Sequence, residues 1–425
     1  MILGMIFMLP LLTRTYFTSL AFNCFTAISL QSGVARAFSA GLPAARMAVS
    51  QDKIDQVRGI MMEFAEETGL TTKKNPPRRY LWTDAHAVCN FLSLYKVTGD
   101  DIYKDLAVGL IDQVHHVLGK HRDDDARSGW ISGLNEEEGE LHPTKGGLRI
   151  GKKLNERGPN DFPDRSLEWD QDGQYLHYVT KWMHALSRAS AVTGDERFGL
   201  WAAELAQAAH HGFSHTVGGR QRYYWKMSID LSRPLVTSSG HHDPLDAYIT
   251  YNEIEFGMKK KILQSEIEEV SGMLQGSYWD TDDSLGIGGL LCDAGRVTQL
   301  TVAKQLKDDG FASSLMQSAR RSLATQSRRS MLEAPADYRL AFRELGMSIG
   351  LRAVPLMNNI LQTTQLKGSA LANADQLQPF VALGKEIEDF WLLPAHQRGQ
   401  RWKEHLDINR VMLATSLLPD EFLAV

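Results

Sequence analysis

The chain has 425 residues, of which 43% are hydrophobic and 23% are charged, and its formal net charge is −5. That length allows a large core, in one big domain or two ordinary ones. The negative balance, with no long basic block, excludes the electrostatic footprint of a nucleic-acid-binding protein. The three cysteines, Cys24, Cys89 and Cys292, form no paired motif, so a disulfide framework and a structural zinc site are both excluded. We expect no metal and no cofactor.

The first fifty residues differ from the rest. They contain no Asp or Glu and only three charged residues, Arg14, Arg36 and Arg46. Apolar runs at 2–12 and 16–30 are too short and interrupted for a stable membrane span. Small residues at 34–40 fit the cleavage site of a targeting peptide, which predicts export or an organelle; a translation start at Met47 instead predicts the cytoplasm. In both cases we expect 1–46 to lie outside the fold and 47–425 to form one domain.

From residue 53 onward the apolar periodicity is helical almost everywhere. An amphipathic first helix ends near Gly69. The segments 87–119 and 181–213 then share one pattern, a helix, the triplet Thr-Gly-Asp and a second helix, with the triplets at Thr98 and Thr193. Glycine there ends one helix and aspartate caps the next. The shared pattern indicates repeated helical hairpins.

Further hairpins are expected toward the end of the chain, which brings the total to six. Only a short insertion at 220–231 is rich in β-forming residues. The predicted helix pairs are 244–258 with 260–275, 287–305 with 309–326, 337–353 with 355–366, and 376–392 with 400–417.

The first helix of most pairs is apolar on nearly every side and carries one narrow polar row. A buried helix must supply such a row with water, a ligand or polar partners. The rows can share water or a ligand if six inner helices point them at a common axis and six outer helices surround the inner ones. We therefore predict an all-α (α/α)6 toroid with long loops and a small β insertion over one end. The alternative is an irregular bundle in which each row has its own hydrogen-bond network. The rows are Thr83, His86, Asn90 and Ser93; Gln174, His177, Lys181, His184 and Arg188; Asp243, Asp246, Thr250 and Glu253; and Asp375, Gln378, Lys385 and Asp389, with shorter versions at Asp293 and Arg296 and at Arg339 and Arg343.

The six hairpins, the aromatic and acidic helix entrances and the Thr-Gly-Asp corners resemble the six-hairpin glycosidase superfamily and the related N-acylglucosamine 2-epimerase-like toroids. The resemblance covers about residues 53–418 and is architectural, so no residue role is carried over. It implies that sugars bind at the end of the ring where the loops gather.

Long connections at 120–172 and 215–243 precede inner helices and belong at that end. The junctions supply carboxylates for acid–base work and aromatic rings for stacking on sugars. Asp172 and Asp243 are our candidate catalytic pair, with Asp84, Asp246 and Asp282 as competitors; Asp84, Asp172 and Asp243 have an alternative reading as helix N-caps. The candidate substrate-binding residues are Trp82, His86, Glu168, Trp169, Asp170, His177, Lys181, Trp225, His241, His242, Glu253, Trp279, Arg339 and Arg343.

The leading hypothesis is a glycoside hydrolase that uses paired carboxylates and acts on an oligosaccharide or a uronic-acid-type sugar. A sugar epimerase with His177 and His242 as proton-transfer bases is the nearest alternative. More distant are a glycan-binding toroid without activity and a terpene-cyclase-like toroid, suggested by "DTDD" at 280–283. A metal site formed by His241, His242 and Asp243 is disfavoured, because adjacent histidines rarely converge on one ion.

Overall fold

The computed structural model describes residues 49–425 except 73, 75, 165, 308–309, 327–330 and 365–368. Residues 48–425 form one compact unit. The expectations for residues 1–46 lie outside the described residues. Within the described part of the chain, no helix is long and apolar enough to cross a membrane.

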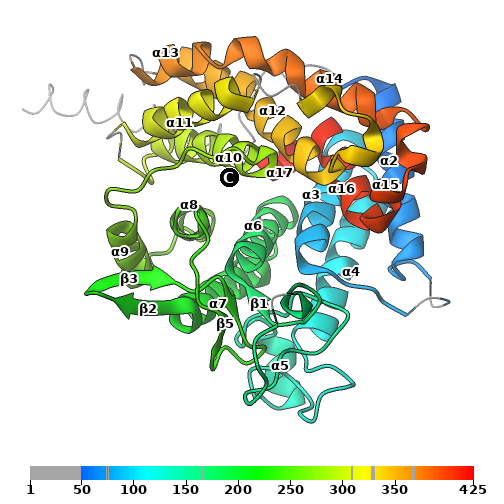
Figure 1. Ribbon diagram of the computed structural model, residues 1–425, viewed down its shortest axis with the longest axis vertical. Helices are drawn as coiled ribbons and strands as arrows, with labels where there is room; N and C mark the ends of the chain where they lie inside the picture. Colours follow the sequence, from blue (N-terminus) through cyan, green and yellow to red (C-terminus); the bar gives the residue numbers. More distant parts are fainter. Residues whose placement is uncertain are drawn as a thin grey trace, which may run out of the picture. The chain divides into compact units, whose positions relative to one another are not determined.

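Six helices form a closed inner ring, which confirms the predicted (α/α)6 toroid. Each packs against the next around the ring, and the last returns to the first, as Figure 1 shows in a view down the ring. They are apolar on most sides because the outer helices cover them. In ring order they are α3 (Leu81–Thr98), α6 (Leu176–Thr193), α8 (Asp243–Met258), α10 (Ser284–Val302), α12 (Ala341–Thr363) and α16 (Leu406–Leu417).

The outer helices cover these inner helices, and the ring closes through two distant parts of the chain. The first helix, α2, packs on α16, so residues 51–67 supply the outer partner of the last inner helix. The outer helices are α2 (Gln51–Glu67), α4 (Asp101–Leu118), α7 (Glu196–Phe213), α9 (Gln264–Met273), α11 (Phe311–Gln326), α13 (Ser369–Asp375) and α14 (Val381–Leu392).

The last two predicted pairs were wrong in detail. Residues 341–363 form one helix that continues through Pro355, so no hairpin separates 337–353 from 355–366. The helix near 376–392 is an outer one, because Gln378, Lys385 and Asp389 are exposed, and the inner helix is α16. Charged residues that recur every three or four positions also occur on the solvent-exposed face of an outer helix, and this is the case for the helix near 376–392.

The Thr-Gly-Asp corners are confirmed at both places. Gly99 and Gly194 end α3 and α6 with φ of 72° and 77°, a left-handed conformation that glycine adopts without steric cost. The side chains of Asp100 and Asp195 then accept hydrogen bonds from the backbone of the first turns of α4 and α7. Each corner reverses the chain from the inner to the outer ring.

Glycines let α10 and α12 approach backbone to backbone. A Cβ added to Gly288 would lie 2.0 Å from the carbonyl oxygen of Gly346, and one added to Gly350 would lie 2.4 Å from the carbonyl oxygen of Gly288. The close approach draws the fourth and fifth inner helices together on one side of the axis.

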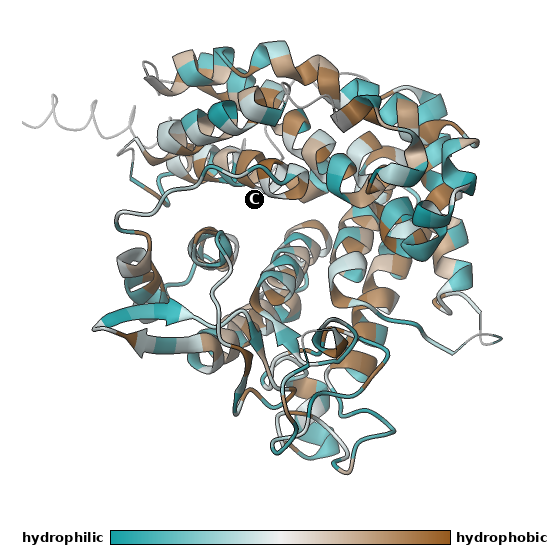
Figure 2. Cartoon of the chain, viewed as in Figure 1, coloured by the Kyte–Doolittle hydropathy of each residue, from teal (hydrophilic) through white to brown (hydrophobic). Residues whose placement is uncertain are grey.

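The connections carry the strands and short helices, and Figure 2 shows that the β2–β3 hairpin and the long loops are more hydrophilic than the helices of the ring. Strands β1, β4 and β5 form an antiparallel sheet in that order, with Gln174 opposite Met227, and β2 pairs with β3, with Ser214 opposite Tyr223. The bounds are α5 (Glu136–Leu141), β1 (Gln174–Tyr175), β2 (Ser214–Val217), β3 (Arg220–Tyr223), β4 (Lys226–Met227), β5 (Pro234–Val236), α15 (Gln400–Glu404) and α17 (Asp420–Leu423), with single 3-10 turns at Leu167–Trp169, Met331–Glu333, Ala336–Tyr338, Gln378–Phe380 and His396–Arg398.

Candidate active site

The polar rows of α6 and α8 face each other, with basic side chains on α6 opposite acidic side chains on α8. The two helices are neighbours in the ring, and both rows step by three or four residues, so His177, Lys181 and His184 of α6 each meet an acid on α8. The last basic group of the α6 row, Arg188, pairs instead with Glu421 of α17. Most of the row therefore has partners within the protein. From the loop end inward the pairs are His177 Nδ1 with Asp243 Oδ1 at 3.9 Å, Lys181 Nζ with Asp246 Oδ1 at 2.7 Å, and His184 Nδ1 with Glu253 Oε1 at 2.7 Å.

Helices α3 and α10 add further polar groups to the same interior. Trp82 and His86 on α3 are buried, with ring centroids 5.2 Å apart. On α10, Asp293 and Arg296 are buried, with Oδ1 and Nη1 3.8 Å apart. Sequence reasoning noted these two as a short polar row but did not name them as site residues. Their signal was an ionisable pair in a helix otherwise made of apolar and small residues.

Several buried polar atoms in this interior have no hydrogen-bond partner among the described residues. Such atoms are costly when nothing polar meets them. They converge: the Trp82 and His177 rings are 6.2 Å apart, and His177 reaches Asp243. A polar ligand placed here would supply the missing bonds. The unpartnered atoms are Trp82 Nε1, both ring nitrogens of His86, His177 Nδ1, Asp243 Oδ2 and Asp293 Oδ1.

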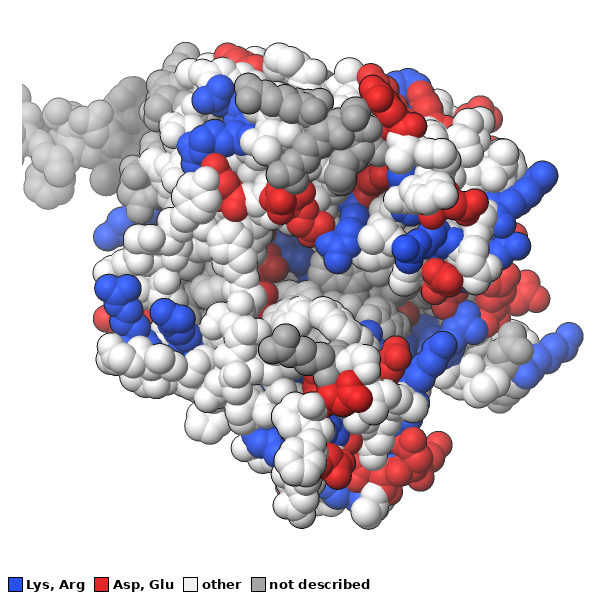
Figure 3. Space-filling model, in the orientation of Figure 1, with Lys and Arg blue, Asp and Glu red and all other residues white. Residues whose placement is uncertain are grey.

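We call these five residues, with Lys181 and Asp246, the axial cluster. Figure 3 shows the surface hollowed over the middle of the ring, with acidic and basic side chains inside the hollow. The cluster holds three carboxyl groups, two imidazoles and one ammonium group.

The three carboxyl groups are driven to different protonation states. Burial, and next the charge of Asp246, raises the pKa of Asp243 to about 7. The same two causes raise the pKa of Asp293 to about 7. Burial also acts against the charged form of Asp246, but the charge and hydrogen bond of the Lys181 ammonium, together with Arg296 and His242, hold the pKa of Asp246 below its usual value. At neutral pH one carboxylate is therefore ionised beside two that hold or readily take up a proton.

Both histidines of the axial cluster are neutral. Burial lowers the pKa of His177 to about 4, and it lowers the pKa of His86 well below the usual value. Neutral imidazoles can donate from one nitrogen and accept at the other. These two rings can therefore serve as hydrogen-bond partners or as proton acceptors.

A chain of aromatic rings leads from the surface to the axial cluster. Trp169 is 56% exposed, and its ring lies 5.2 Å from that of Trp225. The Trp225 ring stacks at 5.4 Å on Tyr175 and at 6.2 Å on His177. Flat rings of this kind stack on the apolar faces of sugars. The predicted platforms Trp82, Trp169 and Trp225 thus lie along one path.

Asp172 does not belong to the axial cluster. It is fully buried, its Oδ2 lies 2.6 Å from Arg149 Nη1, and its Oδ1 accepts a hydrogen bond from the Gly151 amide at 3.0 Å. Both bonds are internal to the long connection 120–172, and Arg149 also donates to the Val117 carbonyl oxygen of α4, which ties the connection to the outer ring. Glu168 has a similar role, with Oε1 2.9 Å from Lys226 Nζ. A loop of this length needs buried anchors, and sequence alone did not distinguish an anchor from a catalytic group.

The N-cap readings of three aspartates were wrong. The caps of α3, α6 and α8 are Tyr80, Tyr175 and His242. Asp84 instead accepts a hydrogen bond from the Tyr80 amide at 2.9 Å and lies 3.4 Å from Arg79, and burial raises its pKa to about 6.

The other predicted residues lie around the rim or in the framework. Asp170 and Asp282 are exposed. Glu253 is paired with His184 as described above. Arg339 pairs with Glu344 at 2.6 Å, and Arg343 pairs with Asp283 at 2.5 Å.

The adjacent histidines His241 and His242 each meet a backbone carbonyl group. His241 Nε2 lies 2.5 Å from the carbonyl oxygen of Tyr278, and His242 Nε2 lies 2.9 Å from that of the buried Trp279. Across the described residues, no group of three or more His, Cys, Asp or Glu side chains is arranged to hold a metal ion.

The acidic run 280–283 also has framework roles. Asp280 Oδ2 lies 2.7 Å from Arg321 Nε, and Asp283 caps α10. Asp282, the middle acid of a cyclase motif, is exposed. The cyclase-like reading of this run is not supported, because its acid does not line an apolar cavity.

No protein-family model matches the chain, and no curated protein matches its sequence. Solved structures resemble it weakly. A cellobiose 2-epimerase from Spirochaeta thermophila shares 13% identity at a TM-score of 0.47, over 87% of this chain and 98% of that one. A sugar epimerase from a ruminal bacterium shares 10% at 0.46, over 85% and 98%. A family 76 glycoside hydrolase from a bovine Bacteroides thetaiotaomicron strain shares 12% at 0.48, over 88% and 78%.

Proposed function

We propose that the chain is a carbohydrate-active enzyme that hydrolyses a glycosidic bond, with Asp243 as the general acid and Asp246 as the partner carboxylate. One observation carries the proposal. The two carboxyl groups lie one turn apart on α8 and differ in protonation, because burial keeps a proton on Asp243 while Lys181 keeps Asp246 ionised. Glycoside hydrolysis needs this division between an acid and a base or nucleophile.

The chemistry follows from these states. Protonated Asp243 donates its proton to the glycosidic oxygen as the bond to the anomeric carbon breaks. The Asp246 carboxylate stabilises the positive charge that develops on the sugar ring, either by direct attack or by activating a water. Lys181 is a positioning residue, because its ammonium group holds Asp246 at 2.7 Å. Trp82 and Trp225 supply stacking surfaces on the way in.

Epimerisation of a sugar is the second candidate, and one observation favours it. Both ring nitrogens of His86, and Nδ1 of His177, have no hydrogen-bond partner among the described residues. A pair of neutral imidazoles on either side of a sugar could take a proton from carbon and return it on the other face. His86 replaces His242 in this pair, because His242 Nε2 is bonded to the Trp279 carbonyl.

One experiment separates the two reactions. The full chain is incubated in D2O with a panel of neutral and acidic mono-, di- and tetrasaccharides, and the products are analysed by NMR and mass spectrometry. Hydrolysis gives new reducing ends without deuterium on carbon, and epimerisation gives deuterium on carbon without cleavage. The proposal expects the first result, abolished by Asp243→Asn and retained by the control Asp105→Asn on the exposed face of α4. Cleavage that survives Asp243→Asn would overturn it.

A further inference from the structure

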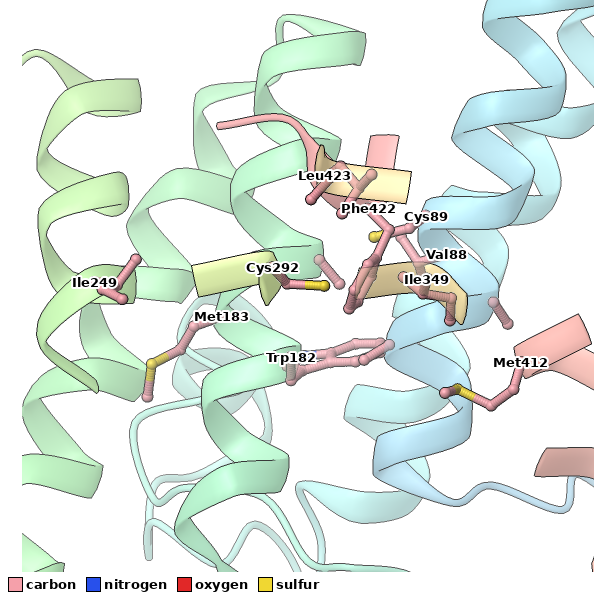
Figure 4. Close-up of a cluster of buried hydrophobic side chains, with 14 of the residues drawn as sticks. Val88, Cys89, Trp182, Met183, Ile249, Cys292, Ile349, Met412, Phe422 and Leu423 are labelled. Carbon is pink, nitrogen blue, oxygen red and sulfur yellow. The ribbon is translucent and has the colours of Figure 1, made fainter. Parts of the chain in front are cut away.

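The short helix α17 lies inside the ring, between inner helices that are far apart in the sequence. It packs against α3, α6 and α10, and the end of the chain is drawn in the middle of the ring in Figure 1. Its side chains Phe422 and Leu423 are buried. Figure 4 shows the Phe422 ring pointing inward between Cys292 of α10 and Val88 and Cys89 of α3.

Bonds to three inner helices hold α17 in this place. Glu421 pairs with Arg188 of α6 at 2.7 Å, and the Glu421 amide donates to Ser93 Oγ of α3 at 3.1 Å. The Leu423 carbonyl accepts a hydrogen bond from Gln299 of α10 at 2.8 Å. A buried ion pair with these added hydrogen bonds fixes one geometry.

Phe422 meets the deep side of the axial cluster. Its ring stacks on His86 with centroids 4.3 Å apart, and the Arg296 guanidinium lies 5.3 Å over it. Its carbonyl oxygen accepts hydrogen bonds from His184 Nε2 at 3.0 Å and from Arg296 Nη2 at 3.2 Å. Phe422 therefore contacts side chains from three of the inner helices, α3, α6 and α10.

The position along α6 gives the depth of the site. His177 lies at the loop end, and His184, which meets Phe422, is seven residues further on. At 1.5 Å of rise per residue, the two levels are about 10 Å apart. Below His184 the interior is filled by the Arg188–Glu421 pair and by Leu423.

We propose that α17 is the floor of the axial cluster: Phe422 closes the ring beneath His86, so a saccharide enters from the loop end alone and only its terminal unit reaches Asp243 and Asp246. This specificity rests on the proposed function, whereas the closure itself does not. The expected substrates are short saccharides or the ends of longer chains, cleaved one unit at a time.

The buried cysteines test the closure without any substrate. Cys89 and Cys292 flank Phe422 and are 1% and 5% exposed, and burial raises the pKa of each thiol to about 12. Only the thiolate reacts with alkylating reagents. Phe422→Ala would open the floor to water, and each unit of pKa lost makes labelling about tenfold faster. The matched control Phe422→Leu keeps an apolar plug.

We would measure maleimide labelling of the native full chain by peptide mass spectrometry, which separates these sites from Cys24. The proposal expects wild type and Phe422→Leu to stay protected and Phe422→Ala to label at least about tenfold faster. Rapid labelling of wild type, or equal rates in the two variants, would overturn the floor. If Phe422→Ala does not fold, hydrogen exchange of the wild type decides: slow exchange of the Glu421 amide supports the floor, and exchange at the rate of an open peptide overturns it.

The substrate limit is tested with a tetrasaccharide that carries a fluorophore at one end. Release of single units from the other end by wild type supports the proposal. Cleavage at internal bonds would overturn the limit while leaving the proposed hydrolysis intact. Protected cysteines together with no cleavage of any saccharide would remove the proposed function, and the substrate limit with it, but not the closure.

Discussion

Replacing Asp243 by Asn should change the pH dependence of stability in a way the structure predicts. The pKa of this buried carboxyl rises from 3.8 to about 7 on folding. Between these values the unfolded chain has released the proton and the folded chain has kept it. The stability that protonated Asp243 contributes is therefore fully present below about pH 4. Between pH 4 and pH 7 the free energy of unfolding falls by about 1.4 kcal/mol for each pH unit because of this group. The total loss from this one group is about 4 kcal/mol.

Asparagine has a similar shape and cannot ionise, so Asp243→Asn removes this loss. Urea unfolding of both proteins at a series of pH values between 4 and 8 measures the free energy of unfolding. Relative to wild type, the variant should gain about 4 kcal/mol between pH 4 and pH 8. Asp105→Asn is the matched control, because the Asp105 side chain is exposed. A difference between variant and wild type that stays constant over this range would refute the burial argument.

Three further predictions concern the framework and the site. Asp172→Asn should lower the free energy of unfolding by about 3–5 kcal/mol, because it breaks a buried ion pair. Turnover by the folded fraction should persist. A variant that loses turnover at unchanged stability would contradict this prediction. Gly288→Ala should lower the free energy of unfolding by about 1–3 kcal/mol, because the added Cβ clashes with the α12 backbone. The control Gly289→Ala should not, because a Cβ there meets nothing within 4 Å. Equal urea midpoints for the two variants would count against the close packing of α10 and α12. Lys181→Met should raise the pKa of Asp246 and lower kcat by about 10²–10⁴, and an unchanged pH–rate profile would exclude Lys181 from positioning.

The sequence predicted the toroid because its signals were local. Two Thr-Gly-Asp corners set identical hairpins, and the apolar inner helices required an outer layer. The last hairpin failed for a long-range reason: α16 finds its outer partner in α2, more than 300 residues earlier in the chain, and no local pattern in 376–417 records that contact.

The candidate site was predicted less well than the fold. The row on α6 was recognised, but pairing it with the row on α8 depends on which helices are neighbours. Asp172 and Asp246 look alike in sequence, as acids at or near a helix start. Arg149, which lies 23 residues earlier in the same connection, meets Asp172, and Lys181 of the neighbouring helix α6 meets Asp246. The role of α17 had no local signal, because a four-residue helix becomes a floor only when the ring surrounds it.

The pH dependence of turnover tests the central claim most directly. Once a cleaved saccharide is identified, kcat/KM is measured from pH 5 to pH 9 for wild type and for Asp243→Asn. If protonated Asp243 is the general acid, kcat/KM falls tenfold per pH unit above about pH 7, where this group loses its proton, and the variant shows no turnover at any pH. A wild-type profile that stays level from pH 7 to pH 9, or a variant that retains turnover, would contradict the account.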